Sequence, residues 1–167
     1  MGGKHFGPNE IEILSRRNIM GNEIRRRDIG IYKANKNVTG AVAQFKLGSN
    51  NDCMFLELAK QTKPMDDSAP YDWENTKITV KLGIADITKM MAYFKMDTDD
   101  ALKLFHRTPK STKTIELKWQ SQYKNYYLSV SSKEGEELKR VSIPIGLDEV
   151  QLLMVGFNRA LEIILSW

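Results

Sequence analysis

Residues 142–158, SIPIGLDEVQLLMVGFN, have the pattern of a buried strand that runs directly into an amphipathic helix. A similar segment, TVKLGIADITKMMAYFK, occupies residues 79–95, at an offset of 63 positions. The residues that are identical at this offset are Gly83 and Gly146, Met91 and Met154, and Phe94 and Phe157. Any strand, glycine and helix in succession would align in part, but here the order of the preceding strands repeats as well. We therefore expect a duplicated structural unit.

Short segments of alternating apolar and polar residues precede each of the two helices, as expected for strands with one buried face. The expected strands span residues 28–36, 39–48, 53–61, 75–83, 101–107, 112–120, 124–133 and 138–145. The sequence thus predicts the α+β class, with four strands and a helix in each repeat. Repeat one covers about residues 28–96 and repeat two about residues 101–167.

The composition excludes several classes of protein. Of the 167 residues, 41% are hydrophobic and 28% are charged, which is typical of a soluble globular domain. No apolar run approaches the roughly 18 to 20 residues that cross a bilayer, so we expect no membrane association. Cys53, the single cysteine, cannot form an internal disulfide, which fits a reducing compartment. We expect it to act as a small buried hydrophobic residue.

Residues 1–27 read as a separate basic arm. Its arginines crowd together at Arg16, Arg17, Arg25, Arg26 and Arg27, and it could contact nucleic acid or proteins of replication or transcription. The arm lacks the apolar core of a secretory signal, and its acidic residues argue against a transit peptide. The expected location is the cytoplasm or nucleoid (host cytoplasm for a phage protein), with an organelle matrix as the alternative.

Basic residues are concentrated in the expected strands, although the whole chain has a net charge of only +4. The strands contain three acids, Asp28, Glu57 and Glu116, against 14 lysines and arginines. The 14 are Lys33, Lys36, Lys46, Lys60, Lys77, Lys81, Lys103, Arg107, Lys113, Lys118, Lys124, Lys133, Lys139 and Arg140. Lysine is disfavoured in strands. It serves there either to discourage edge-to-edge aggregation or to form an electrostatic track for a phosphate backbone.

The aromatic residues favour the second explanation. The residues expected to face the core are Ile31, Met54, Leu56, Leu128 and Val130. Alternation then places Tyr32, Phe55 and Tyr127 outward among the lysines. Outward rings interleaved with cations stack unpaired bases while the cations hold the backbone. Duplex DNA keeps its base faces inside, so the pattern points to single strands.

The candidate binding residues follow from these faces. The lysines expected to neutralise phosphates are Lys33, Lys36, Lys46, Lys77, Lys81 and Lys118. The expected stacking rings are Tyr32, Phe55 and Tyr127. Trp73 is either a further stacking residue at the rim of a sheet or the anchor of a loop. Phe105 and Trp119 are expected to pack in the core.

No enzymatic motif is recognisable in the sequence. It has no Gly-rich phosphate loop, no paired Cys or His ligands and no nucleophile elbow, so we expect no enzyme, no cofactor and no metal. His106 is expected to make a hydrogen bond at a strand end. One alternative is a metal-dependent nuclease built on Glu116 and Lys118. Its upstream acids would be Asp97, Asp99 and Asp100. Alternation alone produces Glu-x-Lys on a polar strand face, so this alternative is the weakest.

The second helix is apolar over most of its circumference. Its main stripe comprises Val150, Leu153, Met154, Phe157, Leu161 and Ile164. Leu152, Val155 and Ile163 lie off this stripe, as in a helix that is buried on two sides. We therefore expect a homo-oligomer, a dimer or a tetramer, that packs through its helices.

Six short motifs occur in order along the chain. They are YDW (71–73), LFHRTP (104–109), YLSV (127–130), IPI (143–145), FN (157–158) and SW (166–167). In this order and spacing, residues 28–167 resemble the Whirly family of single-stranded-DNA-binding proteins. The repeat is also similar to the smaller single-unit eukaryotic transcription coactivator that binds melted DNA. Of the family's basic run on the first strand, only Lys33 and Lys36 are present, and a phage or bacterial homologue is one expected source.

The resemblance implies two ββββα repeats, two antiparallel four-stranded sheets packed crosswise, and helices that assemble a tetramer. It implies a sequence-independent single-stranded DNA-binding protein that protects or presents exposed strands in replication, recombination or transcription. Kinetoplastid mitochondrial guide-RNA-binding proteins share this architecture, so an RNA-binding or annealing protein is the first alternative. A non-binding oligomeric scaffold, whose basic sheet serves solubility, is the second.

Overall fold

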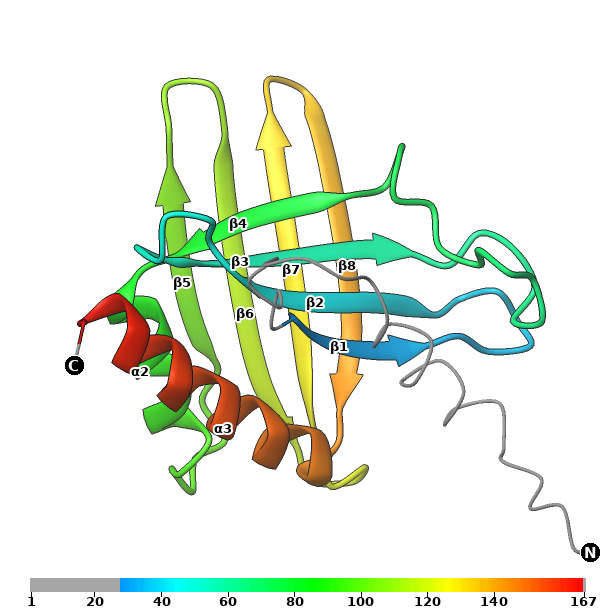
Figure 1. The fold of residues 1–167 in the computed structure, drawn as a ribbon. Helices are drawn as coiled ribbons and strands as arrows, with labels where there is room; N and C mark the ends of the chain where they lie inside the picture. Colours follow the sequence, from blue (N-terminus) through cyan, green and yellow to red (C-terminus); the bar gives the residue numbers. More distant parts are fainter. Residues whose placement is uncertain (1–27, 167) are drawn as a thin grey trace, which may run out of the picture.

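The computed structural model describes residues 28–166, which form two successive ββββα units (Figure 1). The first unit contains β1 (Asp28–Lys33), β2 (Ala41–Leu47), β3 (Met54–Lys60), β4 (Ile78–Leu82) and helix α2 (Ile84–Tyr93). The second contains β5 (Leu102–Arg107), β6 (Thr112–Gln120), β7 (Asn125–Glu134), β8 (Glu137–Ile145) and helix α3 (Leu147–Ile164). Each set of four strands forms one antiparallel sheet in sequence order, which confirms the predicted fold class.

The strand boundaries differ from those expected in a way that affects the charge pattern. Lys36, Lys77 and Lys124 lie just outside the strands, whereas Glu134 and Glu137 lie inside them. The sheets are therefore less one-sidedly basic than the sequence indicated. The predicted basic arm, residues 1–27, lies outside the described residues. None of the described helices is long and apolar enough to span a membrane.

The two sheets cross and pack through their inner faces (Figure 1). The residues predicted to point inward (Ile31, Met54, Leu56, Leu128 and Val130) are all buried, which confirms the period-two assignment. They join one continuous core with Phe45, Leu117 and Ile143. Where the sheets overlap, this packing covers both inner faces, so in that region only the outer face of each sheet is open to a partner.

The two helices lie side by side at one corner of the crossed sheets (Figure 1). The ring of Phe157 on α3 meets that of Phe45 on β2 edge to face, with centroids 5.5 Å apart. Helix α3 also approaches β1 closely, because a Cβ atom at Gly156 would lie 2.0 Å from Ile29 Cδ1. Helix α3 is thus anchored to the first sheet although it belongs to the second repeat.

Both helices begin with the same N-terminal cap, at positions 63 residues apart. Asp86 accepts a hydrogen bond from the Gly83 amide at 3.0 Å, and Glu149 accepts one from the Gly146 amide at 2.7 Å. A carboxylate three residues into a helix satisfies an amide that the helix itself leaves free, and it opposes the positive end of the dipole. The shared cap supports duplication beyond the identity of the glycines.

An aromatic cluster joins α2 to the second sheet. Trp119 is half-buried, and its ring lies 5.0 Å from that of Tyr126, so its predicted place in the core is confirmed. The Tyr93 hydroxyl donates to the Asp100 carbonyl at 2.8 Å and accepts from the Trp119 amide at 3.2 Å. Burial raises the pKa of both tyrosines, so they stay neutral at physiological pH.

The Gln61 side chain fixes the loop between β1 and β2, which carries Lys36. Gln61 is 4% exposed, and its Oε1 accepts from the amides of Asn35 at 2.9 Å and Gly40 at 3.1 Å. Its Nε2 donates to the carbonyls of Asn35 at 3.0 Å and Lys63 at 2.9 Å. All four hydrogen bonds of the amide group are therefore made.

Replacing Gln61 by methionine should destabilise the fold by about 2–4 kcal/mol, because the similar shape leaves buried backbone groups without partners. The free energy of unfolding from urea titrations measures this effect. Gln44→Met is the matched control, since Gln44 is half-exposed and makes one side-chain hydrogen bond, to Tyr32. Equal losses in the two variants would show that the Gln61 network does not stabilise the loop.

Candidate nucleic-acid interface

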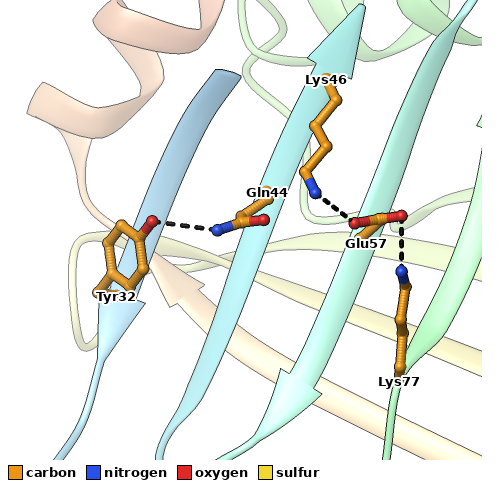
Figure 2. Close-up of polar contacts among 5 residues, drawn as sticks. All are labelled: Tyr32, Gln44, Lys46, Glu57 and Lys77. Carbon is orange, nitrogen blue, oxygen red and sulfur yellow. Dashed lines mark hydrogen bonds and ion pairs between the residues drawn. The ribbon is translucent and has the colours of Figure 1, made fainter. Parts of the chain in front are cut away.

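The outer face of the first sheet carries half of the ten predicted binding residues, namely Tyr32, Lys46, Phe55, Lys77 and Lys81. Figure 2 shows Tyr32, Lys46 and Lys77 among them. Tyr32 is 53% exposed, and its hydroxyl accepts a hydrogen bond from Gln44 Nε2 at 3.1 Å. Its ring lies over Gly30, where a Cβ atom would come within 2.4 Å of the ring. The predicted outward direction of Tyr32 is confirmed, and glycine at position 30 lets the ring lie close to the sheet.

The lysines of this face are already paired with carboxylates. Glu57 lies between two of them, with Oε2 2.6 Å from Lys46 Nζ and Oε1 2.9 Å from Lys77 Nζ (Figure 2). Lys81 lies 3.4 Å from Asp52. Burial by itself would raise the pKa of Glu57, but the hydrogen bonds from Lys46 and Lys77 outweigh burial and lower it. Of the three cations that were predicted to meet phosphates here, Lys46 and Lys77 therefore share one carboxylate, and Lys81 has a longer, exposed ion pair.

Part of the same face is covered by the protein itself. Val42 and Ala59 stand opposite each other on this face, yet both are fully buried. Phe55, between Lys46 and Lys81 in the strand register, is only half-exposed. The first sheet thus offers fewer free rings and charges than expected.

Trp73 lies in a turn that is tied to the end of the first sheet. The turn begins at Asp72, whose Oδ1 accepts from the Asn75 amide at 2.9 Å. Thr76 Oγ1 donates to the Asp72 carbonyl at 2.6 Å and accepts from the Lys60 amide at 2.8 Å. Trp73 itself is half-buried, so it combines features of a loop anchor and of a rim residue.

Two predicted lysines lie away from this face. Lys33 points to the helix side of β1, where its Nζ is 2.7 Å from Glu149 Oε1 on α3. It therefore ties α3 to the first sheet instead of standing beside Tyr32. Lys36 is exposed in the β1–β2 loop. The six predicted lysines do not form one surface.

The outer face of the second sheet carries a residue that the sequence analysis misplaced. Phe105 was expected in the core, but it is 62% exposed. The alternation of β5 explains the error, because Leu104, at 4% exposed, takes the inward position. Tyr127, at 40% exposed, faces outward as predicted and stands opposite Lys118 in the register of β6 and β7.

We call this surface the β5–β8 outer face. Five cations share it with Phe105 and Tyr127. The strand register places on it Lys103, Arg107, Lys118, Lys133 and Arg140. The strand positions of this face carry one acid, Glu116, which lies 3.6 Å from Lys103. Among residues 28–166, the other four cations form no ion pair within 4.0 Å. On this face most cations therefore have no carboxylate partner, whereas the lysines on the outer face of the first sheet are paired.

Small side chains occupy the middle of the β5–β8 outer face. Thr114, Ser129, Ser131 and Ser142 face outward there, and the Ser142 hydroxyl donates to that of Ser129 at 2.9 Å. The rings and cations thus surround a low, polar centre. Lys103, Phe105 and Arg107 were not among the predicted binding residues, although the alternation in LKLFHR places all three on one side of the strand.

The residues of the nuclease alternative do not assemble a metal site. Glu116 faces Lys103, and within residues 28–166 no group of three or more His, Cys, Asp or Glu side chains is placed to hold a metal. His106 Nε2 lies 3.5 Å from Asp86 Oδ2, at the start of α2. Cys53 is 1% exposed and burial raises its pKa, so its predicted role as a buried hydrophobic residue is confirmed.

The predicted oligomer interface forms an open apolar hollow beside α3. Leu152 and Val155 are 52% and 68% exposed, and Ile163 is half-buried. Together with Ile29 and Leu47 they line a hollow of about 260 Å³. Exposed apolar side chains at the rim of such a hollow are typical of a surface that meets a partner.

Comparison with known proteins shows the fold. The sequence matches no protein-family model, and no curated protein matches it significantly. Among solved structures, the plant transcriptional regulator PBF-2 superposes with a TM-score of 0.67 at 16% identity, covering 87% of this chain and 86% of that one. WHY3 from Arabidopsis thaliana has a TM-score of 0.65 at 18% identity, covering 84% and 89%.

A further similarity is to proteins of a different kind. Trypanosoma MRP1/MRP2 superposes with a TM-score of 0.64 at 13% identity, covering 95% of this chain and 96% of that one. A guide-RNA-binding protein complex, solved bound to a guide RNA, has a TM-score of 0.59 at 12% identity. These similarities confirm the Whirly-like fold that the sequence motifs predicted.

Replacing Glu57 by glutamine should destabilise the protein at neutral pH, because Lys46 and Lys77 lose their shared carboxylate. A carboxyl with a lowered pKa contributes stability above its unfolded pKa of about 4.3 and loses it as the pH falls through the folded value. The stability gap between wild type and variant should therefore be widest above about pH 5 and shrink in more acidic buffer. Urea titrations across pH 2.5–7 (roughly the span of this effect) measure it.

Glu116→Gln is the control, since Glu116 has a single, longer ion pair. Its stability gap should be smaller at every pH. A gap for Glu57→Gln that stays constant down to the acid limit would contradict the ion-paired role of Glu57.

Proposed function

We propose that this chain, whose fold is that of the Whirly proteins, binds single-stranded nucleic acid without sequence specificity and prefers DNA. The observation that carries the proposal is the β5–β8 outer face, where five cations and one acid surround two exposed rings. The biological use would be to protect or present exposed strands in replication, recombination or transcription. The action is binding alone, without catalysis.

The geometry of this face suits an unpaired strand. Phe105 and Tyr127 are two strands apart across the sheet and four residues apart along it, which corresponds to roughly 17 Å. Each ring can stack one base, and base stacking on a ring contributes about 1–3 kcal/mol. The nucleotides in between would pass over small hydroxyl side chains, while the surrounding cations meet phosphates. A duplex presents no free base faces to these rings.

The similar structures support nucleic acid as the ligand class. One is described as a transcriptional regulator, and another was solved with a guide RNA bound. RNA is therefore the second candidate ligand. A binding site that stacks bases and neutralises phosphates has no need of the 2′-hydroxyl, so it would accept RNA unless that group is sterically excluded.

The β5–β8 outer face predicts a specific binding defect. Fluorescence anisotropy of a labelled oligo-dT of about 30 nucleotides should show binding that Phe105→Ala and Tyr127→Ala each weaken by about 5- to 100-fold. Tyr123→Ala is the matched control, since Tyr123 is 63% exposed but lies in the turn between β6 and β7. Its affinity should equal that of the wild type.

Three further binding measurements test the same proposal. Lys118→Gln should reduce the slope of log K against log salt by about 0.7. Unlabelled duplex of equal length should compete poorly, and oligo-U should reveal how strongly DNA is preferred. Absence of oligo-dT binding near 0.1 M salt would contradict the proposal and favour the scaffold alternative.

We propose further that a second copy of this chain covers the apolar hollow beside α3. Leu152→Glu combined with Val155→Glu should shift the protein toward monomer in sedimentation velocity, because each charge would be buried in the contact. Gln151→Glu is the control, since Gln151 is an exposed neighbour on the same helix. A wild-type chain that sediments as a monomer at about 100 µM, far above typical dimer dissociation constants, would contradict self-association.

A further inference from the structure

The end of the second sheet projects past β4, the edge strand of the first (Figure 1). Where the first sheet covers it, the inner face of the second sheet is apolar. Beyond the edge of the first sheet, the inner face of the second sheet becomes polar. The change occurs at a single row of residues that pair across the four strands, one residue from each strand. The row is His106, Lys113, Ser132 and Lys139. The change of residue type coincides with the edge of the covering sheet.

Three residues of this row, Lys113, Ser132 and Lys139, line a polar groove of about 90 Å³ beside β4. The residues that line it are Lys77, Thr79, Lys113, Ser132, Glu134, Glu137 and Lys139. Its volume exceeds the roughly 10–15 Å³ that a site needs in order to hold one water molecule. We call it the β4 groove, and it lies on the side of the second sheet opposite to Phe105 and Tyr127.

The donors of the β4 groove are only partly used. Lys113 Nζ donates to the Thr79 carbonyl at 2.8 Å, and an ammonium group has three donors, so two remain. Lys139 forms a long ion pair with Glu137, with Nζ 3.5 Å from Oε1, so its hydrogen-bond donors remain largely unused. Ser132, 8% exposed, adds a hydroxyl at the base of the groove. Lys113 and Ser132 together offer several donors to one small anion.

A hydrogen bond between the two sheets accounts for Lys113, but not for the other polar residues of the β4 groove. Lys113 by itself makes the contact with Thr79 that joins the sheets. Lys139 and Ser132 contribute nothing to that contact, although they complete the row. The two carboxylates, Glu134 and Glu137, lie nearer the hairpin between β7 and β8, so an anion would sit on the side of the groove away from them, over Ser132 and between Lys113 and Lys139.

We infer that the β4 groove binds a phosphate group of a bound nucleic-acid strand. The inference rests on the proposed function and adds a second contact region to it. The groove borders the outer face of the first sheet through Lys77, whereas the stacking rings lie on the far side of the second sheet. A strand that reaches both would pass around the projecting end of the second sheet. The phosphate is either an internal phosphodiester or a terminal monophosphate.

Two oligo-dT probes of about 20 nucleotides, one with a 5′-hydroxyl and one with a 5′-phosphate, test the inference by anisotropy at several salt concentrations. Lys139→Gln should weaken binding by about 3- to 10-fold and lower the salt slope by about 0.7. Ser132→Ala, which leaves the net charge unchanged, should weaken it to a smaller extent. Lys89→Gln, on the exposed side of α2, is the charge-matched control and should bind like the wild type.

The two probes distinguish the sources of the phosphate. An equal loss on both probes identifies an internal phosphodiester, whereas loss of a preference for the phosphorylated end identifies a terminal monophosphate. Wild-type affinity of both Lys139→Gln and Ser132→Ala would overturn the inference and leave the proposed function intact. Absence of binding by the wild type would overturn both. Unfolding titrations of each variant exclude loss of fold as the cause of a defect.

Discussion

The packing of two crossed sheets through their inner faces is the constraint on which the rest of the structure depends. Crossed sheets cover each other only where they overlap, so apolar surface remains at the corners. Helices α2 and α3 fill one corner, and Lys33 and the close contact at Gly156 hold α3 to β1 there. At the projecting end of the second sheet the inner face becomes polar instead. The core, the helix positions and the β4 groove are three consequences of one packing geometry.

The two repeats share their architecture but differ in the chemistry of their outer faces. On the first sheet, Glu57 and Asp52 form ion pairs with three lysines, and Val42 and Ala59 are already covered. On the outer face of the second sheet, four of the five cations form no ion pair among residues 28–166, and they lie around two rings. Both sheets have an outer face, and the two faces differ in the share of cations that are paired with carboxylates. This division supports placing the stacking surface on the second sheet.

Much of the fold could be predicted from sequence, because burial imposes a period of two on strands and of 3.6 on helices. Phe105 was misplaced because aromatic residues are usually buried, although the alternation of its own strand pointed outward. The ion pairs of Lys33 and Glu57 could not be predicted from the sequence, for a different reason. Their partners lie on other strands or on α3, and pairing across such distances in sequence leaves no local pattern. Residue type predicted the faces, but not which charges would remain free.

The order of the strands has a consequence for how the chain is connected. Each strand of a sheet pairs with its neighbour in sequence, and the described chain passes from one sheet to the other only once, at residues 94–101. Neither sheet borrows a strand from the other. A chain of this kind tolerates a break or a new terminus in that connection far better than one with interleaved strands, since the two halves could associate as separate polypeptides through the same inner faces. The architecture is, in this sense, a covalently fused dimer.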